Sequence, residues 1–326
     1  MDDNQNLRGD LKPASLQDWL AVHFAVRLAR FDRLKWVKEM RRAVVSRIAR
    51  EQSAIRFATP YGFELLLPSA DQGTLIMALG RARLHPRVRE ILEASIRPGD
   101  TVIDGGSNVG FFSLLAARLL DGKGQVISFE PDPNTFGLLR QNVEHSGLQS
   151  IVRLEQKALT NCDGTFEFAV LPHEPMRNSL FANPGPMGKT IRVSGVRLDD
   201  YLEANDLQSA DIIKLDLEGA EPLALAGMAV SLQTARLIVF EVNGPLLNQL
   251  GLEPLDLVRG IVEQGSFKKI SFVDEQENRT YAWNPEQFQQ VLRDREIVDV
   301  LCSKNESCPP SATEASTSPG AIVRSA

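Results

Sequence analysis

Acidic residues close four short apolar runs in the middle of this 326-residue sequence: Asp104, Glu130, Asp216 and Glu241. If these runs are parallel strands, their carboxyl ends meet at the edge of a doubly wound sheet where ligands bind. Carboxylates gathered there suit the binding or deprotonation of hydroxyl groups, because each oxygen accepts hydrogen bonds. Glu218 and Glu221 add two more acids. Acids are also typical of the first turn of a helix, and that interpretation is the stronger one for Glu221.

A glycine-bearing loop, Gly105 to Gly110, follows the first of these runs. Apolar residues then recur at helical spacing from Phe111 to Leu119, and the next apolar run ends in Glu130. This order predicts a β-loop-α-β unit with an acid about 20 residues past the loop. Such a unit binds a nucleoside, because glycines admit a ligand close to the backbone and the acid accepts hydrogen bonds from both ribose hydroxyls.

Two residues of this unit indicate which nucleoside it binds. A dinucleotide site requires Gly-x-Gly-x-x-Gly against the pyrophosphate, but Ser107 stands at the middle position. Asp104, directly before the loop, suits an amine better than a phosphate. Both features favour S-adenosylmethionine over NAD. An NAD-dependent oxidoreductase and a turn that binds no ligand are the alternatives.

Successive motifs of the chain resemble those of the FkbM family of S-adenosylmethionine-dependent methyltransferases. They lie in the family's order between about Asp71 and Gly244 and read VIDGGSNVGFFSLLA, VISFEPDPNTFGLLRQNV, KALTNCDG, RLDDYL, IIKLDLEGAEPLALAG and LIVFEVN. The resemblance implies O-methylation of a hydroxyl on a sugar, polysaccharide or related natural product. It also implies an α/β, class I methyltransferase (Rossmann-like) fold, with a doubly wound, mostly parallel sheet and an antiparallel closing strand.

The sequence divides the chain into three parts. Residues 1–55 are expected to form an N-terminal helical extension, residues 56–302 the methyltransferase domain, and residues 303–326 a disordered tail rich in Ser, Pro and Thr. A β-hairpin is expected between Ile55 and Pro68, and two helices between Asp71 and Ile96.

The expected cofactor site combines the loop, the second strand and a later turn. Its residues are Asp104, Gly106, Asn108 and Gly110 for the methionine end, Glu130 for the ribose, Asp132 and Asn134 beside the adenosine, and Ala158 near the adenine. The expected catalytic residues are Asp216, as orienter or base beside the methyl group, and Glu218 and Glu241, which face the acceptor.

The acceptor is expected to be oxygen, because the Asn/Asp-Pro-Pro-Tyr motif of amino-group methyltransferases is absent after the fourth strand. No metal ion is expected, since no His, Cys and Asp cluster has the spacing of a catalytic zinc site. Asp216, Glu218 and Glu241 offer oxygen ligands for magnesium or calcium as the alternative. His173, in a loop rich in Pro and Gly, is an alternative base, and Lys214 is left without an assigned role.

A helical pattern from Ser15 to about Arg50 has one apolar and one strongly basic face. Such a helix either lies on an anionic membrane surface or an acidic partner, or packs on the domain or a second subunit with its charges in water. The alternative function for the whole chain is therefore a non-catalytic methyltransferase-like scaffold that acts through this helix.

Composition narrows the partners further. The net charge of −6 gives no basic field for nucleic acid, so the expected partner is a small-molecule or glycan substrate. Three cysteines without metal-ligand spacing fit a reducing, cytoplasmic setting. Neither an apolar run of membrane-spanning length nor a signal-peptide pattern is found, so we expect a protein that is neither secreted nor inserted in a membrane.

Overall fold

The structure is a computed structural model that describes residues 10–11, 54–59, 61–68, 85–171, 178–181 and 188–304. The predicted basic helix over 15–50, the first helix expected after Asp71 and the candidate base His173 lie outside the described residues. Strand β1 (Asp10–Leu11) pairs with a later strand.

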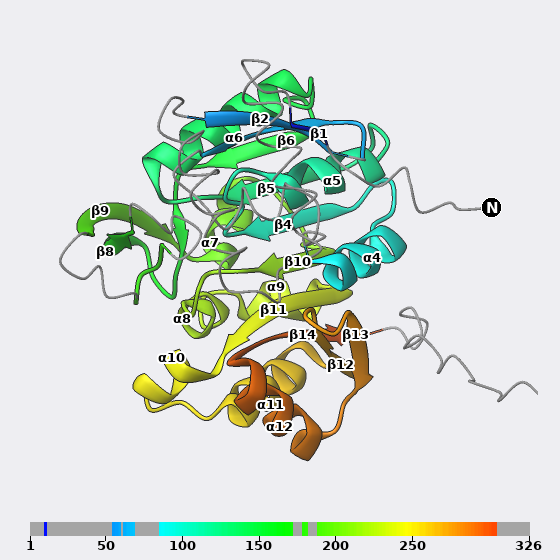
Figure 1. Cartoon of the computed structure of the whole chain (residues 1–326), viewed down its shortest axis with the longest axis vertical. Coiled ribbons are helices and arrows are strands. Elements are labelled where there is room, and N and C mark those ends of the chain that lie inside the picture. The colour runs from blue at the N-terminus through cyan, green and yellow to red at the C-terminus, as the bar shows by residue number, and fades with distance from the viewer. Residues whose placement is uncertain are drawn as a thin grey trace, which may run out of the picture.

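An eight-stranded sheet forms the centre of the molecule (Figure 1). From one edge to the other its strands are β13 (Arg279–Ala282), β12 (Lys269–Asp274), β14 (Ile297–Ser303), β11 (Leu237–Asn243), β10 (Ile212–Leu215), β4 (Thr101–Gly105), β5 (Gln125–Phe129) and β6 (Val152–Glu155). The five strands from β11 to β6 are parallel to one another. Strand β14 pairs antiparallel with β11 and β12, and β12 pairs antiparallel with β13. The predicted doubly wound, mostly parallel sheet is confirmed.

The chain reverses its direction of travel across the sheet between β4 and β10. From β4 the strands proceed outward to β5 and β6, and from β10 they proceed the other way to β11. The loops after β4 and β10 therefore leave the same sheet edge in opposite directions. This is the arrangement in which doubly wound folds place a ligand crevice.

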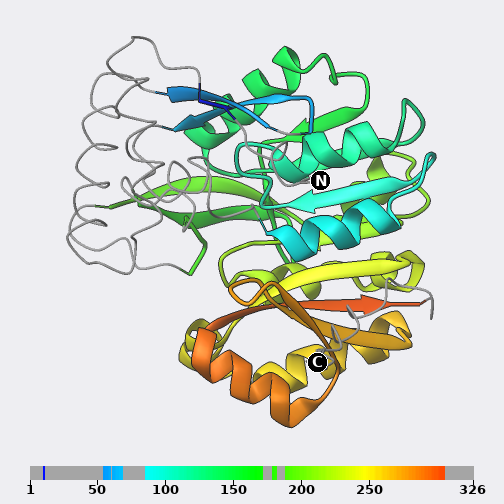
Figure 2. The same ribbon diagram turned by 45° about the vertical axis from the view of Figure 1, so that its right-hand side comes forward.

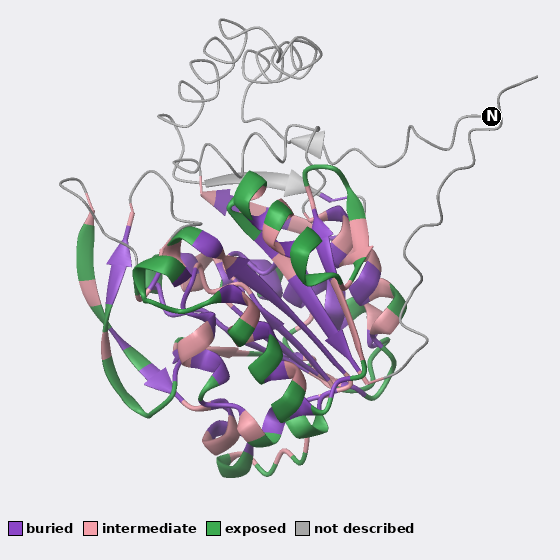
Figure 3. Ribbon diagram, turned by 90° about the horizontal axis from the view of Figure 1, so that it is seen from below, coloured by how far each residue is buried: buried purple, intermediate pink, exposed green. Residues whose placement is uncertain are grey.

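Side chains that alternate along the strands build two cores, one on each face of the sheet. The strands of the central sheet are accordingly mostly buried (Figure 3). Ile212 contributes to one core, whereas its neighbour Ile213 contributes to the other, as strand geometry requires. The first core holds residues of α4 (Pro86–Ser95), α5 (Phe111–Leu119) and α6 (Pro133–His145). The second holds residues of α7 (Leu198–Ala204), α8 (Glu221–Leu225), α9 (Ala229–Thr234), α10 (Gly244–Gln249), α11 (Pro254–Gly265) and α12 (Pro285–Arg295).

Two smaller sheets flank the central one. The predicted hairpin is present as β2 (Ala54–Ala58) and β3 (Glu64–Pro68), and it lies beside α6 (Figure 2). The buried amide of Asn142 on α6 holds it by accepting from the N–H of Leu66 at 2.6 Å and donating to its carbonyl at 3.1 Å. Strands β7 (Ala158–Leu159), β9 (Lys189–Val196) and β8 (Gly164–Val170) form the other sheet.

The closing part of the sheet differs from the expectation in two ways. An antiparallel closing strand was expected; β12 and β13 do pair antiparallel, but a third strand, β14, inserts between β11 and β12 and pairs with both. Because β14 ends at Ser303, the ordered domain passes the expected boundary at residue 302. Within the described ranges, no helix combines the length and the apolar character needed to cross a membrane.

Candidate active site

Two cavities open beside the ends of β4 and β10. Residues lining the Glu130 cavity include Phe129, Glu130, Ala158, Leu159, Phe168 and Leu180. Residues lining the Glu241 cavity include Leu65, Leu67, His85, Phe112, Lys214 and Glu241. Gly106, Asn108, Asp216 and Glu218 line both cavities. The loops after the two switch-point strands therefore form the place where the cavities meet.

The loop after β4 passes directly against the loop after β10 at Gly106. This residue has a φ of 74°, and a Cβ added to it would lie 1.9 Å from the carbonyl oxygen of Asp216. Only glycine therefore fits at this crossing. Asn108, two residues further along the same loop, has a φ of 49°, a left-handed conformation that asparagine tolerates well.

Glu130 follows β5 and is 6% exposed. Its Oε2 accepts from the backbone N–H of Asn108 at 3.0 Å, and its Oε1 accepts from the N–H of Asp132 at 2.9 Å. These two bonds fix the carboxylate, and each oxygen retains acceptor capacity for a ligand hydroxyl. Burial raises the pKa of Glu130 to about 8, and the charges of Asp132 and Asp104 act in the same direction.

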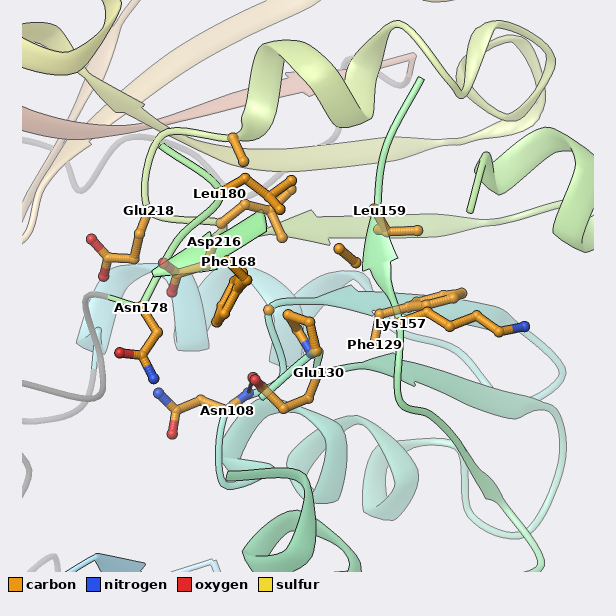
Figure 4. A pocket seen from close by; sticks show the side chains of 15 residues that line it. Asn108, Phe129, Glu130, Lys157, Leu159, Phe168, Asn178, Leu180, Asp216 and Glu218 are labelled. Atoms are coloured by element: carbon orange, nitrogen blue, oxygen red, sulfur yellow. Dashed lines mark hydrogen bonds between the residues drawn. The ribbon is translucent and has the colours of Figure 1, made fainter. Parts of the chain in front are cut away.

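Apolar side chains form the walls of the Glu130 cavity. Phe129 and Leu159 come from β5 and β7, and Phe168 comes from β8. In Figure 4, Phe168 lies between the carboxylates of Asp216 and Glu130. The cavity can therefore hold a flat apolar group against its aromatic walls, and the carboxylates of Glu130 and Asp216 also line it.

A short segment, residues 178–181, covers one side of this cavity. Asn178 donates to Oδ2 of Asp132 at 3.1 Å and accepts from the N–H of Leu171 at 2.7 Å. Ser179 donates to the carbonyl oxygen of Glu218 at 2.8 Å. The segment therefore joins the loops after β5 and β10.

Asp216 stands directly after β10 at the meeting point of the cavities. Its Oδ2 accepts from Nζ of Lys214 at 3.3 Å. Burial opposes ionisation of Asp216, but the positive charges of Lys214 and His85 outweigh it and lower the pKa of the carboxyl. Asp216 is therefore ionised at neutral pH.

Glu218 and Glu241 complete an acidic cluster with Asp216. One oxygen of each of the three carboxylates lies within 4.8 Å of the other two. The side chain of Glu241 is buried. Burial, together with the charges of Asp216 and Glu218, raises the pKa of Glu241 well above its ordinary value. The three predicted catalytic residues are thus brought together.

Asp104 is placed differently from the expectation. Its carboxylate is buried beneath the loop, accepts from the hydroxyl of Ser113 at 2.5 Å and lies 3.7 Å from Nζ of Lys214. It is not among the residues that line either cavity. Its position therefore corresponds to a buried support of the loop and of Lys214, and not to a direct amine contact.

Three other predicted binding residues also serve the framework. Gly110 packs against Leu139, since a Cβ there would lie 2.6 Å from Cδ1 of that side chain. Asp132 is the N-cap of α6, where it accepts from the N–H of Asn134 at 3.2 Å. Neither these residues nor the exposed Asn134 line the two cavities. Ala158, by contrast, lines the Glu130 cavity as predicted.

Two cationic residues of the Glu241 cavity had no predicted role. Lys214 is 5% exposed and lies between Asp104 and Asp216, over the ring of Phe112. His85 precedes α4, with Nδ1 3.8 Å from Oδ2 of Asp299. Burial favours neutral His85, but the adjacent acids outweigh it and raise its pKa to about 9. No local sequence signal identifies His85, because its partners come from distant strands.

The cavities fit S-adenosylmethionine, the cofactor implied by the sequence. Glu130 offers acceptor oxygens to the ribose, the apolar walls suit the adenine, and the Gly106 crossing leaves room for a ligand beside the backbone. The place where a methyl group would emerge is then the junction lined by Asp216 and Glu218.

Comparison with known proteins agrees with this geometry. Residues 104–279, more than half of the chain, match the family described as "Methyltransferase FkbM domain". Hexuronic acid methyltransferase AglP of Haloferax volcanii is 26% identical over 59% of this chain and 73% of its own length. The 31-O-demethyl-FK506 methyltransferase FkbM of Streptomyces tacrolimicus is 28% identical over 41% and 61%. The 2-O-methyltransferase NoeI of Sinorhizobium fredii is 26% identical over 49% and 69%.

The matched region begins at the end of β4 and extends through β12 to the first residue of β13, so it includes every residue at which the two cavities meet. The chain belongs to the FkbM family of methyltransferases.

Proposed function

We propose that this methyltransferase transfers the methyl group of S-adenosylmethionine to a hydroxyl of a sugar, polysaccharide or related natural product. The observation that carries the proposal is the meeting of two cavities at Asp216 and Glu218, one suited to a nucleoside and the other lined by carboxylates. A donor and an acceptor bound in separate cavities that share a junction can be aligned for an in-line displacement.

S-adenosylmethionine supplies a methyl group on a positively charged sulfur. During transfer the bond from sulfur to carbon breaks as the bond from the acceptor oxygen to carbon forms, and the hydroxyl proton leaves. Asp216 is ionised and adjoins both cavities, so we assign it the hydrogen bond from the acceptor hydroxyl and, as the new bond forms, its proton. A weak base suffices, because the oxygen becomes strongly acidic as it is methylated.

Lys214 supports this assignment by holding Asp216 at 3.3 Å in its ionised form. It is a positioning residue, since Asp104 and Asp216 both lie beside its ammonium group. Glu218 and Glu241 face the acceptor from the same junction. Oxygen as the acceptor is supported by these carboxylates and by relatives whose names specify O-methylation or a hexuronic acid.

The test is to incubate the protein with S-adenosylmethionine labelled at the methyl carbon and a panel of uronic acids, neutral sugars and amino sugars. We expect label on an ether carbon of a hydroxylated acceptor, identified by NMR. Asp216→Asn should lower kcat by about 10²–10⁴-fold, typical of a lost general base, while the affinity for S-adenosylhomocysteine changes little.

Asp211→Asn is the matched control. Asp211 precedes β10 at the opposite end from Asp216, where it accepts from the N–H of Thr101 at 2.9 Å. It should retain turnover. Label on nitrogen would contradict the proposed acceptor, and wild-type turnover by Asp216→Asn would contradict the role given to that carboxylate.

A further inference from the structure

We propose that Asp216, Glu218 and Glu241 form a binding site for a hard divalent cation of the magnesium and manganese class. The ion would lie at the junction of the two cavities, on the acceptor side. Its use in the reaction rests on the proposed function, whereas its binding to the three carboxylates does not.

The three ligands come from two neighbouring strands. Asp216 and Glu218 follow β10, and Glu241 lies on β11, which pairs with β10 in parallel. One oxygen from each lies within 4.8 Å of the other two. Oxygens bound to one cation at about 2.0–2.6 Å are separated by at most about twice that distance, so a single ion can reach all three.

Glu241 supplies an independent indication of a ligand. Its side chain is buried at 6% exposure, yet its Oε1 has no hydrogen-bond partner among the residues that the structure describes. An unpartnered buried carboxylate oxygen is costly, and its desolvation is normally offset by a hydrogen bond or a bound cation. Glu241 lines the same cavity as Asp216 and Glu218, so the oxygen belongs to a group that faces them.

Two cationic side chains of the described residues, Lys214 and His85, lie near the cluster. Lys214 lies beside Asp216, but it also lies 3.7 Å from Asp104. His85 lies beside Asp299, a further acid, which stands opposite Glu241 in the antiparallel pairing of β11 and β14. Both of these cations therefore also lie beside acids outside the cluster.

The backbone holds two of the ligands in place. Glu218 adopts a left-handed φ of 51°, and its carbonyl oxygen accepts from the hydroxyl of Ser179 at 2.8 Å. The carbonyl of Asp216 abuts Gly106 too closely to admit a side chain there. These contacts fix the loop that carries the first two carboxylates before any ion binds.

The donor set determines the kind of ion. Three carboxylates without sulfur or nitrogen suit magnesium, manganese or calcium, not zinc or copper. Such ions take about six or more oxygen ligands, so three protein groups leave positions for hydroxyl oxygens of the acceptor. An acceptor with two neighbouring hydroxyls would be oriented by chelation, and the proton of its bound hydroxyl would be lost more readily.

A second acidic group near the site is a poorer candidate. It consists of His85, Glu275 and Asp299, whose ligand atoms also lie close together. Glu275, however, already accepts from the N–H groups of Arg87 at 3.2 Å and Val88 at 2.9 Å, and His85 already faces Asp299. Its groups thus have partners within the protein.

The experiment is a titration of the full-length, metal-free protein with Mn²⁺, followed by the EPR signal of the free ion, without S-adenosylmethionine. We expect one bound ion per chain. Glu241→Gln and Glu218→Gln should each weaken binding by at least about tenfold, because even outer-shell changes at metal sites cost that much. Asp211→Asn, at the opposite end of β10, is the matched control and should bind Mn²⁺ as the wild type does.

Affinity for S-adenosylhomocysteine without metal is measured for every variant as the test of folding and of the nucleoside site. Weak binding of several ions, unchanged binding by Glu241→Gln, or loss of binding by Asp211→Asn would each overturn the proposal. Mn²⁺ binding without any S-adenosylhomocysteine binding would instead refute the proposed function and leave the ion site standing. The reverse pattern would refute the ion site alone.

Discussion

Gly106 is the residue on which the junction of the two cavities depends. Gly106→Ala should unfold more easily and lose affinity for S-adenosylhomocysteine, because its Cβ would lie 1.9 Å from the carbonyl oxygen of Asp216. Gly122→Ala is the control: its φ of 76° matches that of Gly106, but no atom lies within 4 Å of the added Cβ. The control should cost only the left-handed conformation, about 1–2 kcal/mol. Equal losses of stability in urea unfolding would contradict the close approach.

Glu130 should make stability depend on pH. Its pKa is raised to about 8, chiefly by burial and then by the charge of Asp132, while N–H groups of Asp132 and Asn108 oppose the shift. Asp104 adds to the negative charge, and Lys157 lines the same cavity. The folded chain therefore binds this proton more tightly than the unfolded chain. The stability gained is complete below the ordinary pKa of 4.5 and is lost as pH rises through about 8.

Glu130→Gln cannot titrate, so the difference in unfolding free energy between wild type and variant should shift against the wild type from about pH 5 to about pH 9. Urea unfolding at a series of pH values measures this difference. A difference that stays constant with pH would show that Glu130 has an ordinary pKa in the folded chain.

The residues of the site show which positions local sequence patterns can predict and which they cannot. Gly106, Asn108, Glu130 and Ala158 line the cavities as predicted, and so do the three carboxylates that were predicted to be catalytic. A strand end in a doubly wound sheet fixes where its loop lies. Asp104 and Asp132 stand at equally suggestive positions, but their side chains are buried on the framework side. Which way a carboxylate turns depends on partners such as Ser113 and Asn178, which are distant in sequence.

At the scale of elements, helix α6 joins the hairpin to the site. Asn142 bonds both backbone groups of Leu66 in β3 and also donates to the carbonyl of Val109 at 2.8 Å. Leu65 and Leu67 of the same strand line the Glu241 cavity. The buried amide thus helps to position the hairpin, and the hairpin forms one wall of the Glu241 cavity.

Asn142→Ala should therefore lower the unfolding free energy by about 1–3 kcal/mol, since it leaves buried backbone groups without partners. The KM for the acceptor should rise, whereas the affinity for S-adenosylhomocysteine should stay close to that of the wild type. Gln141→Ala is the control, because that exposed side chain bonds only within α6, to the carbonyl of Gly137. Loss of nucleoside affinity without any change in KM would contradict this division of the site.

Most elements from β4 to β12 were predictable, because each combines a clear apolar period with Gly, Pro or Asn at its ends. Helix α12 and strand β14 were missed although local signals exist. Asn284 caps α12 by accepting from the N–H of Gln287 at 2.9 Å, and residues 297–302 are apolar except for Asp299, which is typical of a strand. The position of β14 between β11 and β12 depends on tertiary contacts, which no local sequence pattern encodes.

At the scale of the whole molecule, the topology brings the functional groups together. The change of direction between β4 and β10 opens the sheet edge, and β5 and β11 add Glu130 and Glu241 on either side of it. The Glu130 and Glu241 cavities, which we propose to hold donor and acceptor, therefore meet at the Gly106 and Asp216 crossing. The central claim is that the Glu130 cavity binds the nucleoside of S-adenosylmethionine.

Calorimetric titration of the purified protein with S-adenosylmethionine, S-adenosylhomocysteine and NAD tests this claim most directly. We predict micromolar binding of the first two and none of NAD, with Glu130→Ala weakening binding by at least about tenfold through loss of the ribose hydrogen bonds. Unchanged affinity in Glu130→Ala would contradict the placement of the ribose. Failure of the wild-type protein to bind either sulfur nucleoside would contradict the account as a whole.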